Sequence, residues 1–163
     1  MKSKITKFLL ATLVALPVFG NEHDYSDTEY TQSASHRDLS GANFEGARIL
    51  NVSFGAANLT NANLRNADFS GVNLGYANLT GADLRDANFS KAILEHANLT
   101  GADLTGTDFT DAWFNSKTMW PQGFDPLTIG AHGPGMDYSY SEYTQGATHR
   151  DLTGANFEGA RID

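Results

Sequence analysis

Large apolar residues recur at every fifth position through the middle of the chain, from Leu39 to Phe114. The sixteen members of this series are Leu39, Phe44, Ile49, Phe54, Leu59, Leu64, Phe69, Leu74, Leu79, Leu84, Phe89, Leu94, Leu99, Leu104, Phe109 and Phe114. A small residue, usually alanine, stands two positions before most of them, and Asn or Asp usually stands between. A period of five fits neither a helix nor a flat strand, so the chain has to turn once in every unit.

Four such units would close a square coil, which predicts a second period four times as long as the first. Aligning the sequence in steps of twenty shows this period, because each column keeps its own character. The third column holds Ile49, Phe69, Phe89 and Phe109, which predicts a stack of aromatic side chains along one inner side. Neighbouring coils would lie about 4.8 Å apart, the spacing of hydrogen-bonded strands.

The tandem pattern A(N/D)LxX over residues 37–116 resembles the pentapeptide-repeat family. This resemblance implies a right-handed quadrilateral β-helix. We therefore expect an all-β fold, a solenoid of about four coils over residues 37–116, with the Leu, Phe and Ala positions forming its core.

The segments on either side of the repeats are expected to cap the open ends of the solenoid. Residues 21–36 form a polar N-terminal segment and cap, and residues 117–135 form a C-terminal cap and linker. The apolar side chains expected to cover the last coil are Trp120, Phe124, Leu127 and Ile129. Pro121, Pro126 and Pro134 would prevent further strand pairing.

A duplication follows the second cap: residues 25–49 recur as residues 138–162, with 20 identities in 25 positions. The offset of 113 is not a multiple of five, so the copy cannot continue the first ladder in phase. We expect residues 136–163 to begin a second, incomplete repeat block, and infer a fragment or truncated product of a longer protein with at least two arrays. If the chain is complete instead, this block should be poorly ordered or weakly docked on the first array.

Residues 1–20 have the pattern of a secretory signal peptide. Lys2, Lys4 and Lys7 precede an apolar run from Phe8 to Phe19, and Val18 and Gly20 stand at the small-residue positions of a cleavage site. A membrane anchor is the alternative, but it needs about 20 apolar residues, more than this run contains. We therefore expect cleavage near Gly20 and export to the periplasm or the extracellular space, with no membrane span in the mature chain.

Charge and composition narrow the choice of partner and of chemistry. Cleavage would remove three lysines and no acid, which lowers the formal net charge from −8 to −11. An acidic protein is a poor ligand for phosphate backbones, so we expect a protein partner and no direct nucleic-acid binding. Cysteine is absent, which excludes disulfides and thiolate metal sites.

No residues stand out as a catalytic, cofactor-binding or metal site, so we expect no cofactor and no enzyme. The five histidines are not at metal-ligand spacing, and His36 and its copy His149 are expected to cap a first coil. Asp68, Asp83 and Asp103 alternate with Asn in one repeat position, as does Asp108, which favours turn-bonding or solvated side chains. The hydroxyl residues after the core positions are expected to bond the backbone of the turns.

The function predicted from the sequence is a secreted, non-enzymatic structural or protein-interaction scaffold. The outward side chains most available for contact are Glu45, Arg65, Arg85, Tyr76, Asp86, Lys91, Glu95 and His96. The alternative, suggested by the family resemblance, is an acidic DNA mimic that binds a nucleic-acid-binding protein such as DNA gyrase. The signal peptide, the short array and the five basic residues among nine acidic ones in residues 37–116 all count against mimicry.

Overall fold

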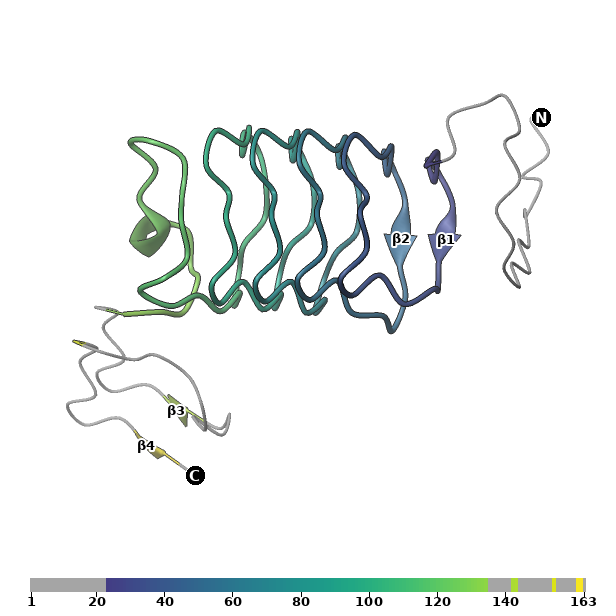
Figure 1. The fold of residues 1–163 in the computed structure, drawn as a ribbon. Helices are drawn as coiled ribbons and strands as arrows, with labels where there is room; N and C mark the ends of the chain where they lie inside the picture. The colour runs from purple at the N-terminus through teal and green to yellow at the C-terminus, as the bar shows by residue number, and fades with distance from the viewer. Residues whose placement is uncertain (1–22, 135–141, 144–153, 155–160, 163) are drawn as a thin grey trace.

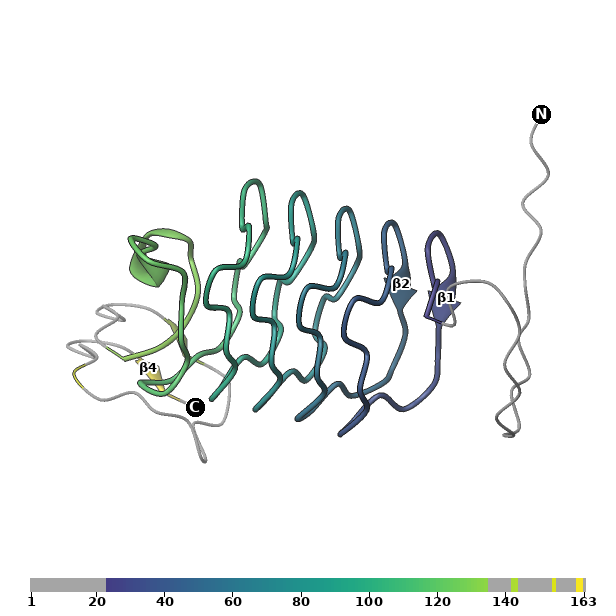
Figure 2. The same ribbon diagram turned by 45° about the horizontal axis from the view of Figure 1, so that its top comes forward.

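The computed structural model describes residues 23–134, 142–143, 154 and 161–162. Residues 23–134 form a stack of coils, seen from the side in Figure 1 and tilted in Figure 2. The regular elements in this part of the chain are β1 (Glu29–Tyr30), β2 (Arg48–Ile49) and the 3₁₀ helix η1 (Pro126–Thr128). No α-helix occurs in the described residues, which agrees with the β-solenoid expected from the repeats.

Isolated parallel β-bridges join a residue in one coil to the equivalent residue in the next coil. Examples are Asn58 with Asn78, Asn78 with Asn98, and Asp68 with Asn88. Each side of the square is too short for more than one bridge because a turn follows within the same five-residue unit. The predicted period of twenty is therefore confirmed, and the ladder consists of many isolated bridges instead of long strands.

A tight turn forms every corner of the square. The amide of Ala62, for example, donates to the carbonyl of Leu59 at 3.0 Å, which closes a four-residue turn. The third residue of each turn has a left-handed φ, such as +69° at Gly71 and +67° at Gly81. Glycine adopts this conformation without a Cβ penalty.

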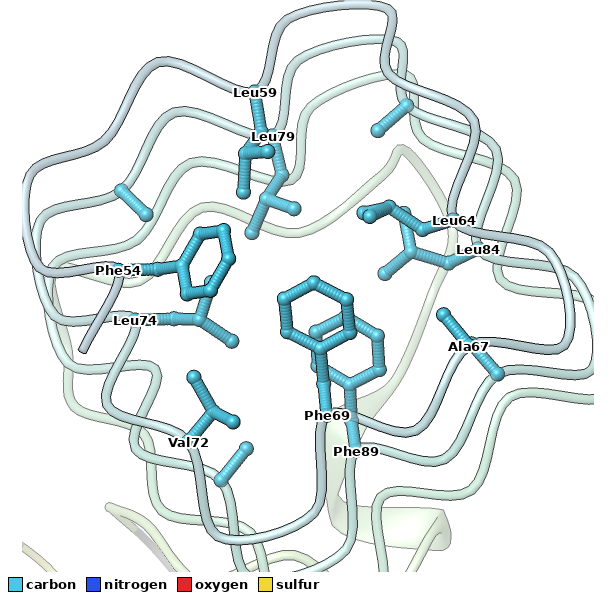
Figure 3. Packing of buried hydrophobic residues seen from close by; sticks show 14 of the residues in the cluster. Phe54, Leu59, Leu64, Ala67, Phe69, Val72, Leu74, Leu79, Leu84 and Phe89 are labelled. Atoms are coloured by element: carbon cyan, nitrogen blue, oxygen red, sulfur yellow. The ribbon is translucent and has the colours of Figure 1, made fainter. Parts of the chain in front are cut away.

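The core consists of the large residues of the five-residue series. Fifteen of the sixteen are buried, and Leu104 in the last coil is half-buried. The Phe69 and Phe89 rings stack at 5.2 Å with an interplanar angle of 5°, and Phe109 follows 5.7 Å from Phe89. Figure 3 shows Phe69 and Phe89 one above the other, which confirms the predicted aromatic column.

Residues 23–36, expected from the sequence to form an N-terminal cap, belong to a further, shorter coil. Strands β1 and β2 pair in parallel with Glu29 opposite Arg48, one position less than the interval of twenty in the coils that follow. Tyr30 is buried, and the Tyr25 ring stacks on Phe44 at 4.7 Å. Two tyrosines therefore take core positions in this otherwise polar segment, and both pack against the first coil of the series.

Residues 117–134, expected from the sequence to form a C-terminal cap, lie against part of the last coil. Their backbone reaches the ladder where Met119 bridges Asn98 and where His132 bridges Trp113. The Trp120 ring meets Phe109 edge to face at 5.5 Å, as the sequence predicted for this residue. Other expected cap residues also pack here: Phe124 stacks on Trp120, and Ile129 lies against the core cluster.

The duplicated segment repeats the first strand pair of the solenoid. Strands β3 (Glu142–Tyr143) and β4 (Arg161–Ile162) pair in parallel, with Glu142 opposite Arg161. These residues are the copies of Glu29 and Arg48, 113 positions later. Apart from Gly154, the remainder of the second block, with His149, lies outside the described residues, as do the expected signal peptide at 1–20 and linker residue 135.

Candidate interaction surface

The four aspartates that alternate with asparagine in the repeat cap turns. The Oδ1 atom of Asp68 accepts the backbone N–H of Ser70 at 3.1 Å, and that of Asp108 accepts the N–H of Thr110 at 2.8 Å. Asp83 and Asp103 bond in the same way to the residue two positions on. Hydrogen bonds from the Thr110 side chain and backbone lower the pKa of Asp108. The turn-bonding interpretation of these residues is confirmed.

The threonine hydroxyls behave differently from what the sequence suggested. Thr60 Oγ1 donates to Asn58 Oδ1 at 2.6 Å, and Thr80 Oγ1 donates to Asn78 Oδ1 at 2.6 Å. The expectation that these hydroxyls bond the turn backbone is wrong at both positions, because the asparagine side chain already caps the turn. Both groups are engaged in local hydrogen bonds, so neither is set up as a nucleophile.

Charges of both signs lie side by side on the side of the solenoid that carries Phe44, Leu64, Leu84 and Leu104, which we call the second side. Arg85 Nε donates to Asp83 Oδ1 at 2.8 Å and lies 3.5 Å from Asp103 Oδ2 in the next coil. The Arg85 side chain holds the pKa of the Asp83 carboxyl below its usual range. The carboxylates on this side are therefore partly neutralised, and they form no continuous acidic stripe.

The C-terminal edge of the last coil is only partly covered by the chain that follows. One coil below, the amides of Leu84 and Asp86 donate to the carbonyls of Asp103 and Thr105. Within the described residues, the equivalent amides of Leu104 and Gly106 have no such partner. A groove of about 580 Å³ lies here between residues 101–105 and 121–124, which explains why Leu104 is only half-buried.

Residues of an unusual kind form one of the four columns of corners. We call the column of His36, Ala56, Tyr76 and His96 the fourth corner; its φ angles are 60°, 55°, 61° and 61°. At the corresponding turn positions the other three columns carry Gly41, Asn61, Gly81, Gly101, Gly46, Asn66, Asp86, Gly106, Asn51, Gly71, Lys91 and Asp111. Glycine adopts positive φ freely, and Asn, Asp and His adopt it more often than other residues, whereas a bulky side chain such as Tyr76 is uncommon there. The fourth corner therefore places rings at positions that favour small or turn-forming residues.

The rings of the fourth corner project beside a groove. Tyr76 and His96 stack at 4.3 Å with an interplanar angle of 10°, and Tyr76 is 67% exposed. Beside them lies a groove of about 400 Å³ whose lining includes His36, Ala56, Tyr76 and Glu95. Gly55 and Gly75, which contribute no side chains, also line this groove.

The outward residues named from the sequence divide into two groups. Glu45, Tyr76, Asp86 and Lys91 are exposed, whereas Arg65, Arg85, Glu95 and His96 are half-buried. The structure brings three of the eight together, since Tyr76 and Glu95 line the same groove and His96 stacks on Tyr76. Sequence reasoning missed the groove itself; the signal was the pair of glycines following core positions 54 and 74.

The described residues supply no feature of a metal centre or a membrane span. They include no group of three or more His, Cys, Asp or Glu side chains placed to hold a metal ion. None of the helices in this part of the chain is long and apolar enough to cross a bilayer.

Comparison with known proteins identifies the class of this solenoid. The family model for pentapeptide repeats matches residues 38–75 and 73–111. The chain is 31% identical to alr5209, a pentapeptide repeat protein from Nostoc Pcc 7120, with 68% of this chain and 84% of that one covered and a TM-score of 0.48. The chain therefore belongs to the pentapeptide-repeat family, as the sequence predicted.

A second solved relative comes from a different organism. The chain is 33% identical to a pentapeptide repeat protein from the Arabidopsis thaliana thylakoid lumen, with 57% of this chain covered and a TM-score of 0.43. The match spans 62% of that protein's length. No curated protein matches the chain.

Proposed function

We propose that this chain is an exported, non-enzymatic scaffold that binds a protein partner through the outer surface of its solenoid. In this proposal an array of about four coils stands between an N-terminal cap and a C-terminal cap. The observation that carries this proposal is that the outer polar side chains are already hydrogen-bonded. Asp, Asn and Thr side chains along the ladder bond to one another and to the backbone of their own turns. Such a surface displays side chains at fixed spacing and offers no evident reactive group.

The lysine-rich start and the apolar run of residues 1–20 support export. The test is to fractionate cells that express the full chain and to sequence the amino terminus of the recovered protein. We expect a chain that starts after Gly20, outside the cytoplasmic membrane. A matched Leu13→Arg variant, which interrupts the apolar run, should remain inside the cell and uncleaved. Recovery of the wild-type chain in the cytoplasm with residues 1–20 intact would contradict export.

Partner binding is tested separately, by cross-linking the exported protein in its host and identifying the captured proteins by mass spectrometry. A scaffold should capture the same protein repeatedly, and a variant with an altered outer surface should lose it. Capture that is unaffected by changes on every outer side would contradict the proposed role.

Nucleic-acid mimicry is less well supported than this proposal. A mimic needs closely spaced, unneutralised carboxylates, whereas Arg85 lies between Asp83 and Asp103 on the second side. We expect the purified mature protein to leave DNA gyrase supercoiling unchanged at micromolar concentration. Inhibition in that assay would favour mimicry over the scaffold.

A further inference from the structure

The ring column of the fourth corner has a gap one coil high. Tyr76 and His96 occupy neighbouring coils, and their rings touch at a centroid distance of 4.3 Å. Below Tyr76 comes Ala56, and only below that comes the next ring, His36. Two coil spacings separate His36 from Tyr76, about 10 Å. We call this gap the slot. The residues that border it, His36, Ala56 and Tyr76, all line the groove of about 400 Å³.

The dimensions of the slot suit one flat group. Van der Waals contacts of about 3.5–4 Å on each face of such a group fill most of the gap. The turns at either end are well held, because the His36 amide donates to the Gly55 carbonyl at 2.9 Å and the Tyr76 amide to the Glu95 carbonyl at 2.9 Å. Gly75 and Asn73 both line the groove, and a Cβ at position 75 would lie 3.1 Å from Asn73 Oδ1, so a larger residue there would crowd the groove wall.

The charge around the slot favours a cation. Glu95 lines the groove, and its carboxylate makes no hydrogen bond or ion pair with another described residue. The basic residue that adjoins His36 in sequence, Arg37, donates instead to the Tyr30 hydroxyl at 3.1 Å. The whole chain carries a formal charge of −8. A nucleobase is also flat, but its phosphates would be repelled by this charge.

A group that is both flat and positively charged is the guanidinium of arginine, which stacks on aromatic faces and forms paired hydrogen bonds with carboxylates. We propose that the slot between His36 and Tyr76 binds an arginine side chain of a partner protein, with Tyr76 stacking on the guanidinium and Glu95 pairing with it. The proposal rests on the scaffold function above and names the chemistry of its partner: an exposed, arginine-bearing segment.

The test uses the full mature protein and three fluorescent peptides that differ at one position. The peptides consist of glycine and serine around a central arginine, lysine or citrulline, which separates planarity from charge. Ala56→Tyr fills the slot by completing the ring column, and Tyr76→Ala removes one wall. Asn66→Tyr, which adds a ring in the corner column of Gly46, Asn66, Asp86 and Gly106, is the matched control. Binding is measured by fluorescence anisotropy, and folding of each variant by circular dichroism.

We expect the wild-type protein to bind the arginine peptide on the order of tenfold more tightly than the other two peptides. Both slot variants should bind all three peptides with similar, weak affinity. The Asn66→Tyr protein should bind as the wild type does. Unchanged binding by a folded Ala56→Tyr protein, equal binding of the lysine peptide, or no saturable binding would overturn the proposal. So would binding of a single-stranded oligonucleotide that both slot variants abolish. If the peptides fail while the intact protein still captures a partner through another side, the slot proposal falls and the scaffold function stands.

Discussion

The molecule contains two stacks of rings with the same origin and different surroundings. Phe69, Phe89 and Phe109 form the inner stack, and Tyr76 and His96 form the outer one. Both exist because the ladder places equivalent residues of successive coils directly above one another. The inner stack is buried and ends against Trp120, whereas the outer stack combines the exposed Tyr76 with the half-buried His96 and stops at Ala56. One geometric rule therefore produces a stabilising column inside the wall and an accessible surface outside it.

The largest expected difference between the two stacks is in stability. Phe89→Ala removes a fully buried ring from between two others and should lower the free energy of unfolding by about 3–5 kcal/mol. Tyr76→Ala removes a ring that is 67% exposed and should lower it by about 1 kcal/mol or less. Urea unfolding followed by circular dichroism measures both values. Equal losses would show that the outer stack is part of the stabilising structure.

Much of the inner structure could be predicted because burial and periodicity determine it. A large residue every fifth position can be buried only if the chain turns in every unit, so the core, the period of twenty and the phenylalanine column followed from the sequence. The role of Asp68 also followed, since it shares a repeat position with Asn88. Leu104 shows the limit of this reasoning: its position in the repeat is regular, but its exposure depends on how far the cap extends.

The candidate site could not be predicted in the same way. Residues Tyr76, Glu95 and His96 appeared only as separate outward residues. Their grouping depends on which side chains are missing beside them, at Gly55, Ala56 and Gly75. Glycine and alanine are common throughout the repeats, so their presence at these three positions does not stand out in the sequence. A groove on the outer surface therefore gives no periodic signal. The polar composition of residues 21–36 similarly concealed a coil in which Tyr25 and Tyr30 take core positions.

A smaller effect is expected at the corners, where backbone conformation separates the fourth column from the others. Gly71→Ala places a Cβ at φ +69° with open space around it, so its effect comes from the backbone alone and should lower stability by about 1 kcal/mol. Ala56→Gly at φ +55° should have the opposite sign and raise stability by up to about 1 kcal/mol. Thermal unfolding of the pair measures both changes. A loss at Ala56→Gly would mean that the methyl group makes a stabilising contact in the slot.

The smallest expected effect is a loss of stability in acid that comes from the outer ladder and leaves the inner stack unaffected. Hydrogen bonds lower the pKa of Asp38, Asp103 and Asp108, and the Arg85 side chain lowers that of Asp83. A folded-state pKa below the ordinary value of 3.8 stabilises the protein above that value, and the stabilisation disappears as pH falls through the folded pKa. Stability should therefore be level from neutral pH to about pH 5 and should fall between roughly pH 4 and pH 2.

Two variants assign this acid effect to the ladder. Asp83→Asn should flatten part of the decline below about pH 4, because it removes one group whose folded pKa is lowered. Phe89→Ala should shift the whole curve to lower stability without changing its shape, because the phenylalanine column has no group that titrates and lies apart from the outer carboxylates. Chemical unfolding repeated at each pH measures both curves. A changed shape in the Phe89→Ala protein would show that the inner column and the outer ladder are energetically coupled, which would contradict their separation.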